Sequence, residues 1–203
     1  ETVPKGGSIM SISSPKPDRK YTYGDYLHWP DEERWEIIDG VPYDMSPAPS
    51  TEHQNISAQL LGQLIAFAAN KSCRVFHAPF DVRLPRRKEK DEEIDTVVQP
   101  DLCVICDPTR LDAQGCKGAP DLVVEIISPA TAKKDLAEKY NLYEKSGVKE
   151  YWVVFPKDKV LQVYHLNDKD IYEKTGTYYA DDTLPCELFP GLEIDLARVF
   201  ANI

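Results

Sequence analysis

The chain has 203 residues, of which 42% are hydrophobic, and a formal net charge of −10 at pH 7. This length fits one domain that can bury a core, and the composition excludes a mostly disordered chain. The negative charge argues against a phosphate-binding surface over the whole protein, and no apolar run reaches the roughly 20 residues of a membrane span, so we expect a soluble protein.

The first residues differ in composition from the rest. Residues 1–20 are rich in Ser, Pro, Lys and Gly, which predicts a flexible tail. The remaining residues, 21–203, show no internal repeat and are expected to form a single domain.

The hydrophobic pattern after this tail predicts helices and strands in mixed order. Asp39-Gly40 is a strong hairpin signal, Ser50 is a favoured N-cap and Gly147 a favoured C-cap. The expected elements are a helix over 22–29, a hairpin over 34–46, a helix over 51–70, strands over 73–84, 96–107 and 119–128, a helix over 131–146, strands over 150–155 and 159–166, and weaker strands with a short helix over 171–200. This order predicts an α/β fold of mixed α+β type, with a central mixed β-sheet flanked by helices, an N-terminal hairpin and C-terminal strand additions.

The cysteines and one basic run suggest little chemistry on their own. Five irregularly spaced cysteines argue against a secreted disulfide framework and for a reducing cytoplasm. Cys103 and Cys106 form a CxxC motif, but without a second pair nearby we expect two ordinary half-buried thiols rather than a zinc or redox site. The basic run over 83–88 is best explained as a solvated hairpin tip.

Glu125 interrupts the apolar run of the strand expected over 119–128. Side chains alternate along a strand, so Glu125 shares one face with Val123 and Ile127. An isolated carboxylate is very costly to bury in its charged form. We therefore expect Glu125 to meet a cation or a hydrogen-bond donor, or to be protonated.

Lys139 lies on the expected packing face of the next helix. Leu136, Tyr140 and Tyr143 mark an apolar arc when successive residues are placed about 100° apart. Lys139 falls inside that arc, and Asp135 lies one turn before it. An ordinary helical ion pair would explain the spacing of Asp135 and Lys139 but not their place within the arc.

Three further polar residues stand at apolar positions, and each has a simpler explanation. His53 lies on the apolar face and in the first turn of the 51–70 helix, where a capping or satisfied core histidine is common. Asp101 begins an apolar strand and could be a turn residue after a proline. Glu36 could be a plain strand carboxylate.

Considered together, two strand carboxylates and a lysine on a packing face match the requirements of metal-assisted phosphodiester hydrolysis. Mg²⁺ is usually held by one or two carboxylates and keeps several waters. The metal lowers the pKa of a bound water. A lysine ammonium can orient that water or stabilise the negative charge that develops.

Five sequence blocks resemble the Uma-two-type family of restriction endonucleases, which belongs to the PD-(D/E)XK nuclease superfamily. In chain order they are RWEIIDG, SPAPSTEHQNIS, QPDLCVI, GAPDLVVEIISPAT and DLAEKYNLYEKSGVKEYWVV. The resemblance implies a restriction-endonuclease-like core.

The resemblance also implies which residues form the site. Asp101 matches the first aspartate of the motif and Glu125 its second acidic position. Both would bind the metal together with the backbone carbonyl of Ile126. Ile127 stands where the motif has lysine, and Lys139 on the next helix is the expected replacement.

Four further residues would complete this site. Glu36 and His53 match positions that the family pattern favours and would act as metal or water contacts. Asp121, on the strand of Glu125, and Asp135, on the helix that carries the lysine, would support it.

We therefore expect a Mg²⁺- or Mn²⁺-dependent endonuclease that hydrolyses DNA with a metal-activated water, forms a homodimer and works in the cytoplasm without a membrane anchor. The alternative is a catalytically inactive nuclease fold that serves as a binding or assembly module, which the net charge and Ile127 favour. A glycosidase would also use paired carboxylates, but the sequence shows no aromatic platform for a sugar.

Overall fold

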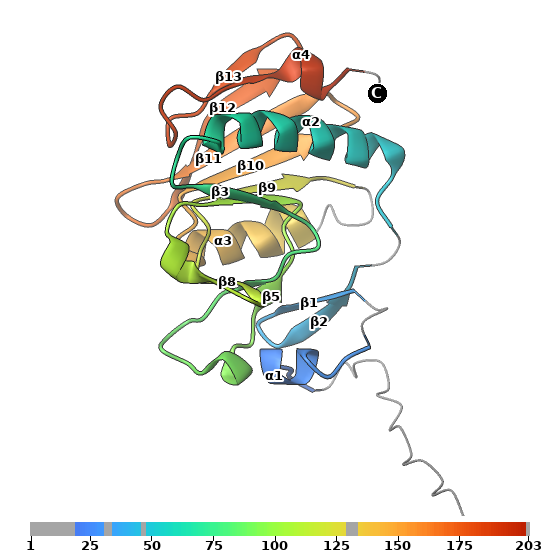
Figure 1. Ribbon diagram of the computed structural model, residues 1–203. Coiled ribbons are helices and arrows are strands. Elements are labelled where there is room, and N and C mark those ends of the chain that lie inside the picture. The colour runs from blue at the N-terminus through green and yellow to red at the C-terminus, as the bar shows by residue number, and fades with distance from the viewer. Residues whose placement is uncertain (1–18, 31–33, 46–47, 129–133, 202–203) are drawn as a thin grey trace, which may run out of the picture.

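The computed structural model describes residues 19–30, 34–45, 48–128 and 134–201, with the side chains of residues 134 and 135 left out of the description. The predicted tail therefore lies almost wholly outside the described residues. The described residues form a mixed α/β fold, as the sequence predicts (Figure 1).

The long apolar strands form a six-stranded sheet, the main sheet, in the order β12-β11-β10-β9-β6-β3. Its strands are β3 (Arg74–His77), β6 (Leu102–Ile105), β9 (Leu122–Ile126), β10 (Glu150–Phe155), β11 (Val160–Leu166) and β12 (Tyr172–Tyr179). β9 and β10 are parallel and the other pairs are antiparallel, so the sheet is mixed as predicted. β9 is buried at every residue because both faces of the sheet are covered.

Shorter strands form a second six-stranded sheet, in the order β2-β1-β5-β4-β8-β7. They are β1 (Trp35–Ile38), β2 (Val41–Asp44), β4 (Val82–Arg83), β5 (Val97–Val98), β7 (Leu111–Asp112) and β8 (Gly115–Lys117). The predicted hairpin is confirmed, and its turn residues Asp39 and Gly40 both have positive φ, at 52° and 78°. The sequence pattern did not predict β7 and β8.

Two segments predicted as single strands are each divided between the two sheets. Residues 73–84 form β3 and β4, and residues 96–107 form β5 and β6. Pro79 and Pro100 lie between the divided parts. Because proline has no N–H to donate, it interrupts the ladder at these points. Within each of these two segments the chain passes from one sheet to the other, which links the two sheets.

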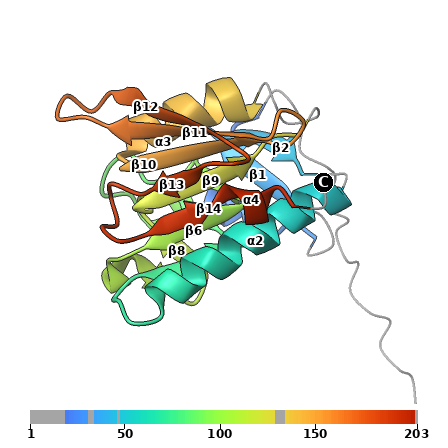
Figure 2. The ribbon, with the colours of Figure 1, turned by 90° about the horizontal axis from the view of Figure 1, so that it is seen from above.

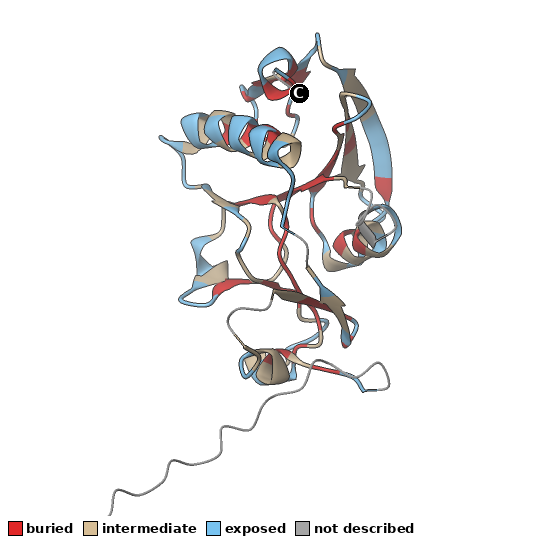
Figure 3. Cartoon of the chain, turned by 90° about the vertical axis from the view of Figure 1, so that its right-hand side faces the viewer, coloured by how far each residue is buried: buried red, intermediate tan, exposed pale blue. Residues whose placement is uncertain are grey.

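Helices cover both faces of the main sheet (Figures 1 and 2). α2, capped by Ser50 as predicted, packs on one face together with α4 and the β13–β14 hairpin, whereas α3 lies on the opposite face, between the two sheets. The bounds of the remaining elements are α1 (Tyr23–Tyr26), α2 (Thr51–Ala68), α3 (Tyr140–Ser146), α4 (Leu196–Val199), β13 (Thr183–Pro185), β14 (Glu193–Asp195) and the 3₁₀ turns Asp91–Glu93 and Pro108–Arg110. Figure 3 shows that buried residues concentrate on the strands between these layers, while the outer side of α2 is exposed. Within the described ranges, no helix is long and apolar enough to cross a lipid bilayer.

The helix predicted over 131–146 begins irregularly in its described part. Lys134–Lys139 is a π-helical turn that leads into α3, which ends at Gly147 with the left-handed φ of 82°. Because a π-turn bonds i to i+5, its side chains do not follow the 100° spacing of an α-helix. Leu136, predicted to lie within the packing arc, is 44% exposed, so that prediction was wrong. Lys139 is buried, as expected.

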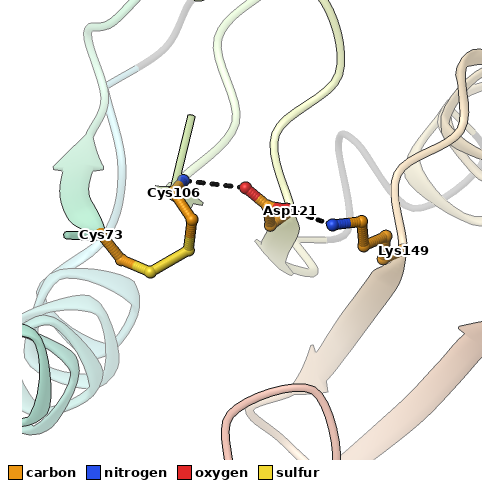
Figure 4. Close-up of a disulfide and its surroundings, with 4 residues drawn as sticks. All are labelled: Cys73, Cys106, Asp121 and Lys149. Carbon is orange, nitrogen blue, oxygen red and sulfur yellow. Dashed lines mark hydrogen bonds and ion pairs between the residues drawn. A yellow bond between two sulfur atoms is a disulfide. The ribbon is translucent and has the colours of Figure 1, made fainter. Parts of the chain in front are cut away.

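A disulfide joins two neighbouring strands of the main sheet (Figure 4). Cys73 and Cys106 continue by one residue the register that pairs Arg74 with Ile105. The expectation of two ordinary thiols at Cys103 and Cys106 was therefore wrong for Cys106. Because side chains alternate along a strand, residues three apart point to opposite faces, and Cys103 is instead a buried free thiol.

Arg83 corrects the expectation that the basic run over 83–88 is a solvated tip. Its side chain is fully buried and forms ion pairs with Asp91 and Asp112. Arg86, three residues later, is exposed as expected. The run therefore contributes a buried cation to the second sheet rather than a continuous basic surface.

Candidate functional site

A buried ammonium bridges two buried carboxylates where the main sheet faces the second sheet. Lys139 Nζ lies 2.9 Å from Glu36 Oε1 and 2.8 Å from Glu125 Oε1. Glu36 comes from β1, Glu125 from β9, and Lys139 from the turn that enters α3. All three side chains are at least 97% buried. Residues far apart in sequence therefore meet at the point that the sequence pattern indicated.

Neutral donors also hold these carboxylates. The backbone N–H of Gln99 donates to Glu36 Oε1 over 2.8 Å, and the Tyr143 hydroxyl donates to Glu125 Oε1 over 2.7 Å. Burial, and then the charges of Glu125 and Glu36, raise the pKa of Tyr143 well above its ordinary value. Tyr143 therefore stays protonated and donates its hydrogen to the carboxylate.

Asp101 lies beside Glu125 at the same end of the main sheet. β6 and β9 are antiparallel with Leu102 opposite Val124, so one further step of the register places Asp101 opposite Glu125. Asp101 Oδ2 accepts a hydrogen bond of 2.7 Å from the amide of Ile126. Its side chain is 19% exposed, so Asp101, unlike Glu36 and Glu125, is accessible to solvent.

His53 reaches Asp101 from the first turn of α2. Its amide donates to the capping hydroxyl of Ser50, and its Nε2 lies 3.1 Å from Asp101 Oδ2. In the neutral ring the nitrogen that faces the carboxylate carries the proton, so Nδ1 is an acceptor. Nδ1 is buried and has no hydrogen-bond partner among the described residues.

Asp121, one of the two predicted supporting residues, does not join this cluster in the described contacts. Asp121 accepts hydrogen bonds from the Cys106 amide and from Lys149 Nζ, at 2.8 and 2.7 Å (Figure 4). It shares a face with Glu125, but four residues along a strand correspond to about 13 Å. Asp121 therefore stabilises the opposite end of β9. The side chain of Asp135 lies outside the described part of the chain.

Two residues of the site were not predicted from the sequence. Tyr143 falls within the apolar arc of the predicted helix, a position that indicates a packing residue. Tyr143 follows Lys139 by four residues, which places both on the same side of a helix, and this spacing could have indicated that its hydroxyl lies near the carboxylate that Lys139 contacts. Gln99 acts through its backbone amide, and no sequence pattern reveals that contact.

The oxygen donors at this end of the sheet suit a hard divalent cation. Carboxylates of Asp101 and Glu125 and the backbone carbonyl of Ile126 are ligand types that Mg²⁺ accepts. In the described part of the chain, hydrogen bonds reach Oδ2 of Asp101 but not Oδ1, so Oδ1 can bind a cation without losing a contact. No group of three or more His, Cys, Asp or Glu among the described residues is arranged to hold a metal. Mg²⁺ that is held by one or two carboxylates usually keeps several water ligands.

Comparisons with known proteins agree with this architecture. The model of the Uma2 family, described as "Putative restriction endonuclease", matches residues 23–197. An uncharacterized protein of Synechocystis is 27% identical over 163 residues, which cover 79% of this chain and 82% of that protein. The crystal structure of "a putative nuclease belonging to DUF820" from Anabaena variabilis superposes with a TM-score of 0.69 at 19% identity, covering 89% of this chain and 97% of that one. The predicted fold class is confirmed by this match.

Proposed function

Since this chain belongs to the Uma2 family, described as restriction endonucleases, we propose that it is a divalent-metal-dependent endonuclease that hydrolyses phosphodiester bonds of DNA. The observation that carries the proposal is the convergence of Lys139 and Glu125 beside Asp101. It combines two carboxylates and an ammonium, which this reaction requires, at one end of a nuclease-like sheet.

Asp101, Glu125 and the carbonyl of Ile126 would hold Mg²⁺ or Mn²⁺. The bound ion would supply an activated water and charge stabilisation at the phosphate. Lys139, held by Glu125, would orient that water or stabilise negative charge on the phosphate oxygens. Ile127 occupies the position at which the motif usually has lysine, and Lys139 brings the same charge to Glu125 from the neighbouring helix.

Glu36 and His53 would set the geometry of this site. Glu36 shares the ammonium of Lys139 with Glu125 and so limits its movement. His53 directs a ring N–H toward Asp101 Oδ2, which leaves Oδ1 for the cation. Both act on residues that would contact the metal or the phosphate.

The test is cleavage of supercoiled plasmid with Mg²⁺ or Mn²⁺, combined with calorimetric titration of Mn²⁺. Glu125→Gln and Lys139→Met are expected to lower the cleavage rate at least about 100-fold, the usual loss for a group that stabilises transition-state charge. Glu150→Gln is the matched control, because Glu150 is also a buried carboxylate of the main sheet but is bonded to Trp152 at the other end of the strands. Cleavage that persists in both site variants would contradict the proposal.

A non-catalytic binding or assembly module is the second candidate. It is favoured by Ile127 at the usual lysine position and by the net charge of −10, which disfavours contact with DNA. Absence of both Mn²⁺ binding that depends on Asp101 and metal-dependent cleavage would support the module.

We also propose a homodimer, because cutting both strands of a duplex commonly needs two sites, and sedimentation tests it directly. Cytoplasmic location is a prediction from the cysteine spacing. The Cys73–Cys106 disulfide argues against it, since disulfides are rare in that compartment.

A further inference from the structure

A pocket of about 320 Å³ opens beside the candidate site. His53, which contacts Asp101, lines it, and so do Ile127 and Ser128, which follow Glu125 and Ile126 directly in the chain. The turn after β10 closes another side. The proposed nuclease chemistry uses His53 but leaves the pocket itself unexplained.

The lining of the pocket suits an uncharged ring better than a phosphate. Ile127, Phe155 and Pro156 form its apolar part, and Phe155 is half-buried at the end of β10. The charged residues of the lining are Glu52, Asp158 and Lys157, so carboxylates outnumber ammonium groups. Excess negative charge disfavours a phosphate, whereas an aromatic side chain in an apolar wall can stack on a nucleobase.

We propose that this pocket takes one unstacked nucleobase of the DNA strand next to the phosphate that is cut. The proposal rests on the proposed nuclease function and adds a substrate class to it: DNA with an unpaired nucleotide, such as a single strand, a bulge or a flap. A fully paired duplex keeps its bases stacked and cannot fill the pocket without extruding one of them.

The first experiment measures binding without cleavage, by fluorescence anisotropy of oligonucleotides with Glu125→Gln protein. We expect the single strand and a duplex with one bulged nucleotide to bind about tenfold more tightly than the blunt duplex of the same sequence. This difference corresponds to one base–aromatic stack. Moving an abasic residue along the single strand should reduce affinity by a similar factor at one position.

Phe155→Leu keeps the apolar volume and removes the ring face. It is expected to abolish both the preference for unpaired DNA and the effect of the abasic residue. Phe76→Leu is the matched control, since Phe76 is also half-buried but lies on β3 and does not line this pocket. Equal affinity of wild type for all three DNAs, or an unchanged preference in Phe155→Leu, would overturn the pocket assignment.

Cleavage assays separate this outcome from failure of the proposed function. Metal-dependent cutting of blunt duplex with no preference for unpaired DNA would overturn the pocket and leave the nuclease intact. Binding of unpaired DNA that depends on Phe155, without cleavage of any substrate by wild type, would support the pocket and contradict the nuclease.

Discussion

We expect replacement of Lys139 to lower the free energy of unfolding substantially, whereas replacement of Glu125 should change it little. Both side chains belong to the same buried ion network, in which Glu36 and Glu125 share the Lys139 ammonium. Lys139→Met keeps a side chain of similar length but removes the cation. It leaves two carboxylates facing each other in a buried space.

The expected loss follows from the distances. The Oε1 atoms of Glu36 and Glu125 both lie within 2.9 Å of Lys139 Nζ, so the distance between the two oxygens is less than about 6 Å. At about 6 Å and an effective dielectric constant of 20, two unit negative charges repel each other by roughly 3 kcal/mol. Removing one partner of a buried ion pair typically costs about 3–5 kcal/mol. We expect the free energy of unfolding of Lys139→Met to fall by that amount at pH 7.

Glu125→Gln has the opposite charge balance. It removes one of two negative charges and leaves Glu36 and Lys139 as a one-to-one pair. The amide still has an oxygen to accept the Tyr143 hydroxyl. We expect a change in the free energy of unfolding within about 1 kcal/mol, with cleavage lost in both variants.

Urea denaturation followed by circular dichroism measures the unfolding free energies, and plasmid cleavage measures activity. Lys149→Met is the control, because Lys149 also pairs with a carboxylate but is 56% exposed, and such surface pairs contribute about 0–1 kcal/mol. If Lys139→Met were as stable as wild type, or if Glu125→Gln were the more damaging change, the inferred charge balance would be refuted.

Three further predictions concern other parts of the molecule. Tyr143→Phe removes the hydroxyl that donates to Glu125, and we expect about tenfold slower cleavage and roughly 1 kcal/mol lower stability. Burial raises the pKa of Asp81, although hydrogen bonds from neighbouring side chains oppose the shift. The contribution of Asp81 to stability is therefore present below its unfolded pKa of 3.8 and lost as pH rises through the folded pKa, so Asp81→Asn should exceed wild type in stability at pH 7 but not below pH 3.8. Thiol titration in guanidinium should find three thiols before reduction and five after it, because Cys73 and Cys106 form a disulfide.

Each of these has a control or a contradicting result. Tyr172→Phe removes a buried hydroxyl that donates to a backbone carbonyl rather than to the site, and cleavage should not change. A stability difference for Asp81→Asn that is the same at pH 7 and pH 3 would contradict the assigned shift. Five reactive thiols before reduction would show that the disulfide does not form in solution.

The sequence alone indicated most of the element types and the main catalytic candidates. A carboxylate inside the apolar β9 segment and a lysine among tyrosines require partners once buried, and this requirement can be read from local periodicity. It correctly indicated burial of Glu125 and Lys139. The hairpin turn, the N-cap of α2 and the C-cap of α3 were likewise predictable, because single residues such as Ser50 and Gly147 determine them locally.

Only the tertiary structure decided which of these groups meet. The sequence pattern could not show that two predicted strands divide between sheets, and that division holds β1 with Glu36 against the main sheet. The tertiary structure also placed Asp121 at the far end of β9 and Cys106 beside Cys73. Periodicity specifies the face on which a side chain lies, whereas contacts between distant segments depend on strand order and register, which packing of the whole chain determines.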